Sequence, residues 1–201
     1  MNREIQMSRL RKWYGHLTRF KQVKGTSLSN FWHAIAFWGG SGYNVKMPGT
    51  MGTIAAIPLH LIMVSYLTPV WYIVTTALLA LFGIWICAVA DEDIQDHGGR
   101  PDSVTIVFDE VVGLLVTMSF FFLVDESQSW EDELWRTFLG VIAFRYFDIK
   151  KPSFIGFLDK SQHGGLGIMI DDVAAAIAAG LASVGAYILL MLLLLVVVYM
   201  M

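Results

Sequence analysis

Three long apolar runs constrain this chain most strongly, because each can cross a bilayer as a helix. They cover residues 71–90, 105–124 and 173–201, and about 20 apolar residues span the roughly 30 Å of hydrocarbon. Two shorter runs, 53–67 and 134–148, extend the pattern. None of them alternates apolar and polar residues as a barrel strand does. With 56% hydrophobic residues and a mean hydropathy of +0.58, the chain is expected to be an all-α integral membrane protein.

The distribution of basic residues predicts the orientation of the helices. Residues 1–30 contain seven Lys or Arg and one acid, so the positive-inside rule places this arm in the cytoplasm, where it can lie on the membrane as an amphipathic helix. We predict a bundle of about five membrane-spanning helices, at about residues 53–67, 71–90, 104–124, 134–148 and 168–190. This topology leaves thirteen of the fourteen Lys and Arg residues on the cytoplasmic side.

The chain is expected to form one transmembrane domain, residues 31–201, behind the basic arm 1–30. The first part of this domain is aromatic and then Gly-rich, with the sequence FWHAIAFWGGSGYNVK. It reads as an interfacial or re-entrant segment that leads into a helix beginning near Pro48.

Acidic residues occur within or at the end of three of the apolar runs. Asp109 and Glu110 enter one run, and Asp171 and Asp172 enter another at a matching depth, while Asp148 closes a third. An ionised carboxylate in hydrocarbon costs several kcal/mol, on the order of 3 by insertion scales, so something must offset that cost. In the predicted topology all five lie at the cytoplasmic ends of their helices, where they can share one site.

A divalent cation is the partner that these carboxylates suit best. Crowded carboxylates repel one another unless they are protonated, paired with cations or bound to a metal. Hard oxygen ligands favour Mg²⁺, which binds through a few carboxylates together with substrate phosphate, and no cluster of His and Cys suggests zinc. We therefore predict that Asp109, Glu110, Asp171 and Asp172 bind Mg²⁺.

Other polar residues at the same level suit an anionic phosphate. Gly49 and Thr50 open a helix, whose free N–H groups can face an anion. Residues that could contact a headgroup at this level are Lys46, Arg145, Lys150, Lys151 and His163. The sequence thus predicts a Mg²⁺ site open to the inner leaflet that acts on a phosphorylated lipid; no nucleic-acid partner is expected.

Simpler interpretations stay open at this point. Arg145 and Asp148, three residues apart, can be a structural pair within one helix, and His163 can be a turn residue. A cation transporter or channel also buries carboxylates, though usually near the midplane and with repeats or broken helices. A structural membrane subunit would tolerate Asp→Asn changes in both acidic pairs.

Four segments together resemble one known family. PGTMGT, DSVTIVFDEVVG, FRYFDIKKP and HGGLGIMIDDVAAA occur in the order, and at about the spacing, of the phosphatidylglycerophosphatase A family. The resemblance covers roughly residues 30–185. It implies a Mg²⁺-dependent enzyme of the bacterial inner membrane, with its active site facing the cytoplasm. Such an enzyme removes the terminal phosphate of phosphatidylglycerophosphate to give phosphatidylglycerol.

The resemblance also implies a set of functional residues. They are Gly49, Thr50, Asp102, Asp109, Glu110, Asp148, Lys151, Pro152, His163, Gly164, Asp171 and Asp172. We expect Lys151 and backbone N–H groups near Thr50 to hold phosphate oxygens, and His163 to protonate the leaving glycerol oxygen. The loop before residue 105 is long, so Asp96 is an alternative to Asp102. The nucleophile that attacks the phosphate can be water or one of the aspartates.

Overall fold

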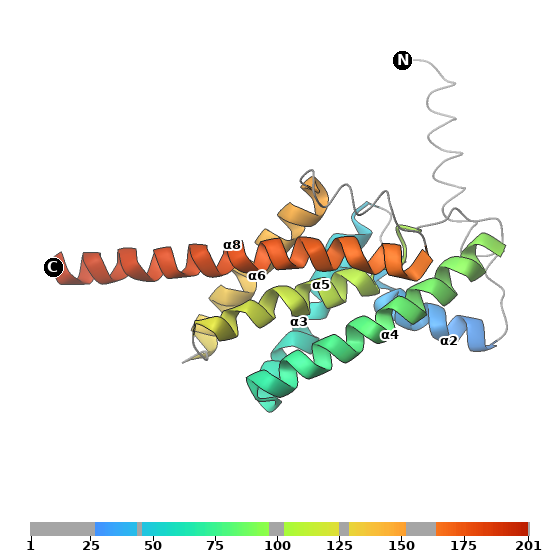
Figure 1. Cartoon of the computed structure of the whole chain (residues 1–201), viewed down its shortest axis with the longest axis horizontal. Coiled ribbons are helices and arrows are strands. Elements are labelled where there is room, and N and C mark those ends of the chain that lie inside the picture. The colour runs from blue at the N-terminus through green and yellow to red at the C-terminus, as the bar shows by residue number, and fades with distance from the viewer. Residues whose placement is uncertain (1–26, 44–45, 97–102, 125–128, 152–163, 201) are drawn as a thin grey trace, which may run out of the picture.

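The structure, a computed structural model, describes residues 27–43, 46–96, 103–124, 129–151 and 164–200. Within these ranges the chain forms helices and no strand. The elements are α2 (Ser27–Ala36), η1 (Trp38–Tyr43), α3 (Pro48–Tyr66), α4 (Pro69–Asp96), α5 (Phe108–Ser119), η2 (Phe120–Leu123), α6 (Trp130–Lys150) and α8 (Gly164–Met200). Figure 1 shows them packed side by side. The basic arm lies mostly outside the described residues, so its amphipathic helix stays a prediction.

Several helices begin or end away from the expected positions, for local reasons. Helix α3 begins at Pro48, as the sequence predicted, and so it extends before the expected span 53–67. Proline suits the first turn, where its missing N–H is not needed. Helix α6 begins at Trp130, after Ser129, whose hydroxyl accepts a hydrogen bond of 3.1 Å from the Asp132 N–H. Helix α4 continues to Asp96, so residues 91–96, expected in a cytoplasmic loop, are helical.

The run 105–124 is apolar mainly because it forms the centre of the bundle. Helix α5 begins only at Phe108. Before it, the Ile106 N–H donates to the Ser103 carbonyl at 2.9 Å in a turn, and the Val107 N–H donates to the Ala36 carbonyl at 3.0 Å. Val111, Val112 and Leu114 are fully buried, and α5 packs against α3, α4, α6 and α8. A helix that is apolar on all sides is expected in such a core. The expectation of one regular span over 104–124 was therefore wrong at its beginning.

Three helices are long and apolar enough to cross a membrane among the residues that the structure describes. They are Pro48–Tyr66, Pro69–Asp96 and Gly165–Met200. The all-helical class and the association with a membrane agree with the sequence. The count of about five spans and the re-entrant segment stay predictions, because α5 and α6 do not meet the same length and composition.

Helix α8 is much longer than its neighbours. It has 37 residues, which corresponds to about 55 Å, and Figure 1 shows its C-terminal part extending beyond the other helices. The side chains from Leu189 to Met200 are exposed, and all are apolar or aromatic. Such an apolar surface has no hydrophobic cost when lipid surrounds it.

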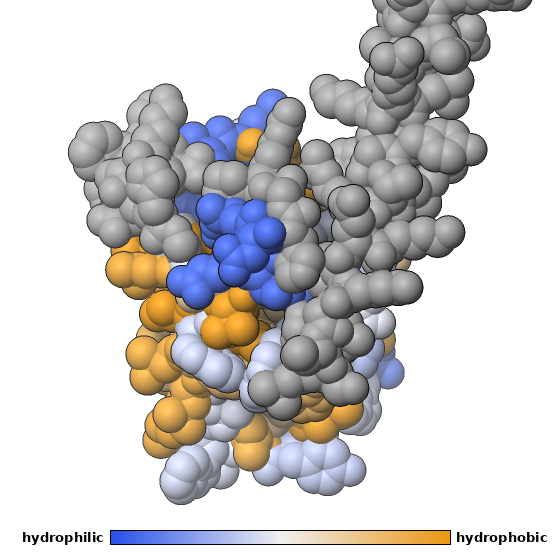
Figure 2. Space-filling model, turned by 90° about the vertical axis from the view of Figure 1, so that its right-hand side faces the viewer, coloured by the Kyte–Doolittle hydropathy of each residue, from blue (hydrophilic) through white to orange (hydrophobic). Residues whose placement is uncertain are grey.

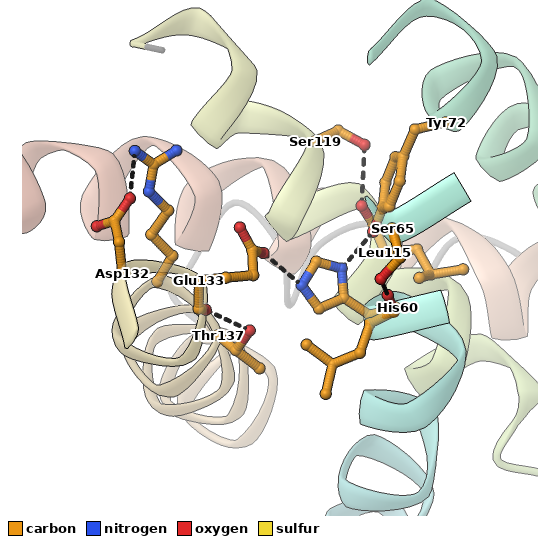
Figure 3. Close-up of polar contacts among 10 residues, drawn as sticks. His60, Ser65, Tyr72, Leu115, Ser119, Asp132, Glu133 and Thr137 are labelled. Carbon is orange, nitrogen blue, oxygen red and sulfur yellow. Dashed lines mark hydrogen bonds and ion pairs between the residues drawn. The ribbon is translucent and has the colours of Figure 1, made fainter. Parts of the chain in front are cut away.

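A buried polar network joins four helices at the end of the bundle where α3 ends and α6 begins (Figure 3). The His60 ring is hydrogen-bonded through Nε2 to Glu133 Oε1 and through Nδ1 to the Tyr72 hydroxyl, both at 2.9 Å. Nearby, the Arg136 guanidinium donates to the Tyr187 hydroxyl at 3.2 Å. Because buried polar groups without partners are costly, this network fixes how α3, α4, α6 and α8 pack.

We expect Glu133→Ala to lower the free energy of unfolding by about 1–3 kcal/mol, because it leaves the buried His60 ring without its carboxylate partner. Denaturant titration in detergent measures this. Glu131→Ala, at an exposed position in the same helical turn, is the matched control and should change the value by less than about 0.5 kcal/mol. Equal effects of the two substitutions would show that the network does not stabilise the bundle.

Candidate functional site

Three carboxylates meet where α5 begins. Asp109 and Glu110 lie in the first turn of α5, and Asp172 lies on the neighbouring helix α8. One oxygen of each can be chosen so that all three lie within 4.8 Å of one another. Asp109 and Asp172 are buried and Glu110 is nearly so. The prediction that the two acidic segments come together is confirmed for these three residues.

One oxygen of each carboxylate in this cluster has no hydrogen-bond partner among the described residues. Asp109 Oδ1, Glu110 Oε2 and Asp172 Oδ2 are buried and accept no hydrogen bond from the part of the chain that the structure describes. Buried polar atoms are nearly always satisfied in folded proteins, so three such oxygens at one place suit a positively charged ligand. A hard divalent cation such as Mg²⁺ fits an all-oxygen set of this kind.

Two basic side chains border the cluster, each paired with another acid. Arg145 Nη1 lies 2.5 Å from Asp148 Oδ2 and 3.9 Å from Glu110 Oε1. Lys151 Nζ pairs with Asp171 Oδ2. The α6 helix places both bases here: Arg145 lies in its last turns, and Lys151 follows in the left-handed conformation, with φ 37°.

Asp171 therefore differs from its neighbour Asp172. Adjacent residues of a helix point about 100° apart, so both cannot face the same point equally. Asp172 joins the three-carboxylate cluster, whereas Asp171 pairs with Lys151. Direct binding of a metal by Asp171 stays a prediction.

Gly49 allows the first turn of α3 to approach the cluster closely. A Cβ atom built at this position would overlap Glu110 Oε1 and would lie 3.0 Å from both terminal nitrogens of Arg145. Only glycine leaves room for this contact. The glycine of the PGT segment thus has a structural reason beyond starting a helix.

A cavity of about 960 Å³ opens beside the cluster. Ten residues expected at the site line it: Lys46, Gly49, Thr50, Asp109, Glu110, Arg145, Asp148, Lys151, Asp171 and Asp172. On the face at this end of the molecule, Figure 2 shows hydrophilic residues gathered above hydrophobic ones. Lys150 is exposed and is not among the residues that line the cavity. His163 and Asp102 lie outside the described residues, so their roles stay predictions.

The sequence did not single out two polar residues of the cavity. Asp91 and Gln95 lie on the last turns of α4 and line the same space, and Gln95 Nε2 donates to Asp91 Oδ2 at 2.8 Å. They fell in a segment expected to be a loop. Their spacing of four residues, which places two side chains on one helical face, was the signal that could have identified them.

Comparison with known proteins identifies related sequences. The model of a family described as phosphatidylglycerophosphatase A matches residues 34–187. The chain is 36% identical over 170 residues to phosphatidylglycerophosphatase A of Escherichia coli strain K12, an alignment that covers 82% of this chain and 90% of the relative. It is 38% identical over 166 residues to phosphatidylglycerophosphatase A of Haemophilus influenzae, covering 81% and 93%. No solved structure matches the chain.

Proposed function

Because the chain belongs to the phosphatidylglycerophosphatase A family, we propose that it hydrolyses phosphatidylglycerophosphate to phosphatidylglycerol and phosphate. We place the reaction at the carboxylate cluster, with Mg²⁺ bound by Asp109, Glu110 and Asp172. The observation that carries this assignment is the group of three buried, unpartnered carboxylate oxygens beside a large cavity. Without a cation, these oxygens would repel a phosphate as well as one another.

The side chains around the cluster have distinct tasks in this reaction. When bound, Mg²⁺ supplies positive charge for the phosphate oxygens. Lys151 lies at the cavity, where its ammonium group can contact a phosphate oxygen while Asp171 holds it in place. Arg145 offsets the charge of Asp148 and Glu110, which lowers the cost of bringing an anion here.

Hydrolysis breaks the bond between phosphorus and the glycerol oxygen, so the leaving oxygen must gain a proton. His163 is our candidate for this general acid. It comes directly before Gly164, where α8 begins, so it is close in sequence to Asp172, the member of the cluster on α8. Thr50 and backbone N–H groups in the first turn of α3 are proposed to hold the remaining phosphate oxygens, since a helix N-terminus favours anions.

We propose that the protein lies in the bacterial cytoplasmic membrane with this site facing the cytoplasm. The arm of residues 1–30, with seven basic residues and one acid, supports this orientation. The cluster lies near the beginnings of α5 and α8 rather than midway along them. That position gives the cation-transporter alternative no support, because transporters place such sites near the midplane.

Phosphate release from phosphatidylglycerophosphate by the purified protein in detergent tests the proposal. We expect release with Mg²⁺ present, loss of release in EDTA, and recovery when Mg²⁺ is added in excess, because three buried carboxylate oxygens of the cluster accept no hydrogen bond from the described residues. Release that continues unchanged after extensive chelation would contradict the metal site. A folded protein that releases no phosphate with Mg²⁺ present would contradict the lipid phosphatase itself.

A further inference from the structure

We infer that Asp91 binds a hydroxyl group of the substrate's polar headgroup, and that it thereby selects lipids whose phosphate is attached to a hydroxyl-bearing headgroup. The inference deepens the proposed function and rests on it. It follows from the position of a buried, oriented carboxylate on the wall of the cavity, apart from the three-carboxylate cluster.

The Asp91 carboxylate is held in a defined position. The residue is only 3% exposed, and it lines the cavity near the end of α4. Gln95 donates a 2.8 Å hydrogen bond to Asp91 Oδ2, which restricts rotation of the carboxylate. Ser103 lines the same cavity and shares a 2.8 Å hydrogen bond with the Thr105 hydroxyl. This wall of the cavity is thus built from groups that form hydrogen bonds with neutral polar ligands.

The chemistry of Asp91 excludes a phosphate as its direct ligand. An ionised carboxylate only accepts hydrogen bonds, and it repels phosphate oxygens. The basic residues that suit a phosphate, Arg145 and Lys151, come from the end of α6. The group of three carboxylates that could hold a metal does not include Asp91. Among the groups of the proposed substrate, a hydroxyl is the one that can donate to this acceptor.

The size of the cavity leaves room for such a headgroup. Its volume of about 960 Å³ lies at the upper end of the roughly 300–1,000 Å³ typical of small-molecule sites, and a phosphate with its cation fills only part of it. Phosphatidylglycerophosphate carries one free hydroxyl, on the glycerol between its two phosphates. With the terminal phosphate at the cluster, that hydroxyl is the nearest donor that the substrate can offer to the cavity wall.

The proposed hydrogen bond from the headgroup hydroxyl to Asp91 should make the protein prefer substrates that carry this hydroxyl. A hydrogen bond to a charged acceptor contributes enough to change kcat/KM by about 10- to 100-fold. We therefore expect wild-type protein to prefer phosphatidylglycerophosphate by about that factor over an analogue in which the headgroup glycerol is replaced by 1,3-propanediol. The two lipids differ only in the hydroxyl.

The test measures kcat/KM for both lipids with wild type, Asp91→Ala and Glu92→Ala. Asp91→Ala should reduce kcat/KM for the natural lipid about 10- to 100-fold and change kcat/KM for the deoxy analogue little. The ratio of the two kcat/KM values should therefore fall to about threefold or less. Glu92→Ala removes the same charge from the next position, which also borders the cavity but is exposed, and it should retain the preference.

The outcomes separate this inference from the function on which it rests. Wild type that hydrolyses both lipids equally, or Asp91→Ala that loses activity on both by the same factor, would overturn the role of Asp91 and leave the phosphatase intact. Wild type that hydrolyses neither lipid would overturn the proposed function and the inference together.

Discussion

Replacing Asp172 by Asn should lower the rate of phosphate release from phosphatidylglycerophosphate by at least about 100-fold. Loss of groups that only orient a metal ligand already costs about 10- to 100-fold in affinity or activity, and Asp172 is proposed as a ligand itself. Asn keeps the shape of the side chain but removes one of the three charges that meet within 4.8 Å. Release of inorganic phosphate at saturating Mg²⁺ measures the effect.

A matched control separates this effect from a general loss of charge. Glu131→Gln removes one carboxylate charge from an exposed position in the first turn of α6, away from the residues that line the cavity, and should leave the rate unchanged. A folded Asp172→Asn protein with wild-type activity would contradict the metal site.

Replacing Gly49 by Ala should lower the rate of phosphate release by about 100-fold, although it leaves the charge of the site unchanged. The added Cβ would take the place of Glu110 Oε1 and would press on the Arg145 guanidinium. Displacing a catalytic group by about 1 Å can cost on the order of 100-fold in rate. Phosphate release at saturating lipid and Mg²⁺ gives the change.

Gly185 offers the matched control for this substitution. It also lies in a helix, but no heavy atom lies within 4 Å of a Cβ built there. Gly185→Ala should retain full activity and should stabilise the helix by up to about 1 kcal/mol, since Ala favours helices over Gly. If Gly49→Ala were as active as Gly185→Ala, close approach of α3 to Glu110 would not be needed for the reaction.

The cluster itself could be predicted from the sequence because charge in an apolar run is a strong local signal. Asp109, Glu110 and Asp172 stand out in runs that are otherwise apolar, and equal depth in two helices was enough to bring them together. The spacing could not distinguish Asp171 from Asp172. Which of two adjacent side chains faces the site depends on the rotation of α8 within the bundle, and only the packing fixes it.

Other features depend on pairings between distant parts of the chain. His60 and Glu133 are 73 residues apart, and neither lies in a motif that would suggest its partner. The apolar run 105–124 could not reveal that α5 is surrounded by other helices, because a buried helix and a lipid-facing helix have similar composition. Asp91 was missed since the end of α4 was placed near residue 90, whereas the helix continues to Asp96.

Binding of Mn²⁺ by the wild-type protein and by Asp172→Asn, followed by electron paramagnetic resonance in detergent, tests most directly whether the carboxylates hold a divalent cation. Mn²⁺ prefers the same oxygen ligands as Mg²⁺, and its free signal decreases on binding. We expect the wild type to bind Mn²⁺ in competition with Mg²⁺, and Asp172→Asn to bind it at least about 10-fold more weakly. Equal affinity of the two proteins, or no binding by a wild-type protein that releases phosphate, would show that the cluster of Asp109, Glu110 and Asp172 is not the metal site.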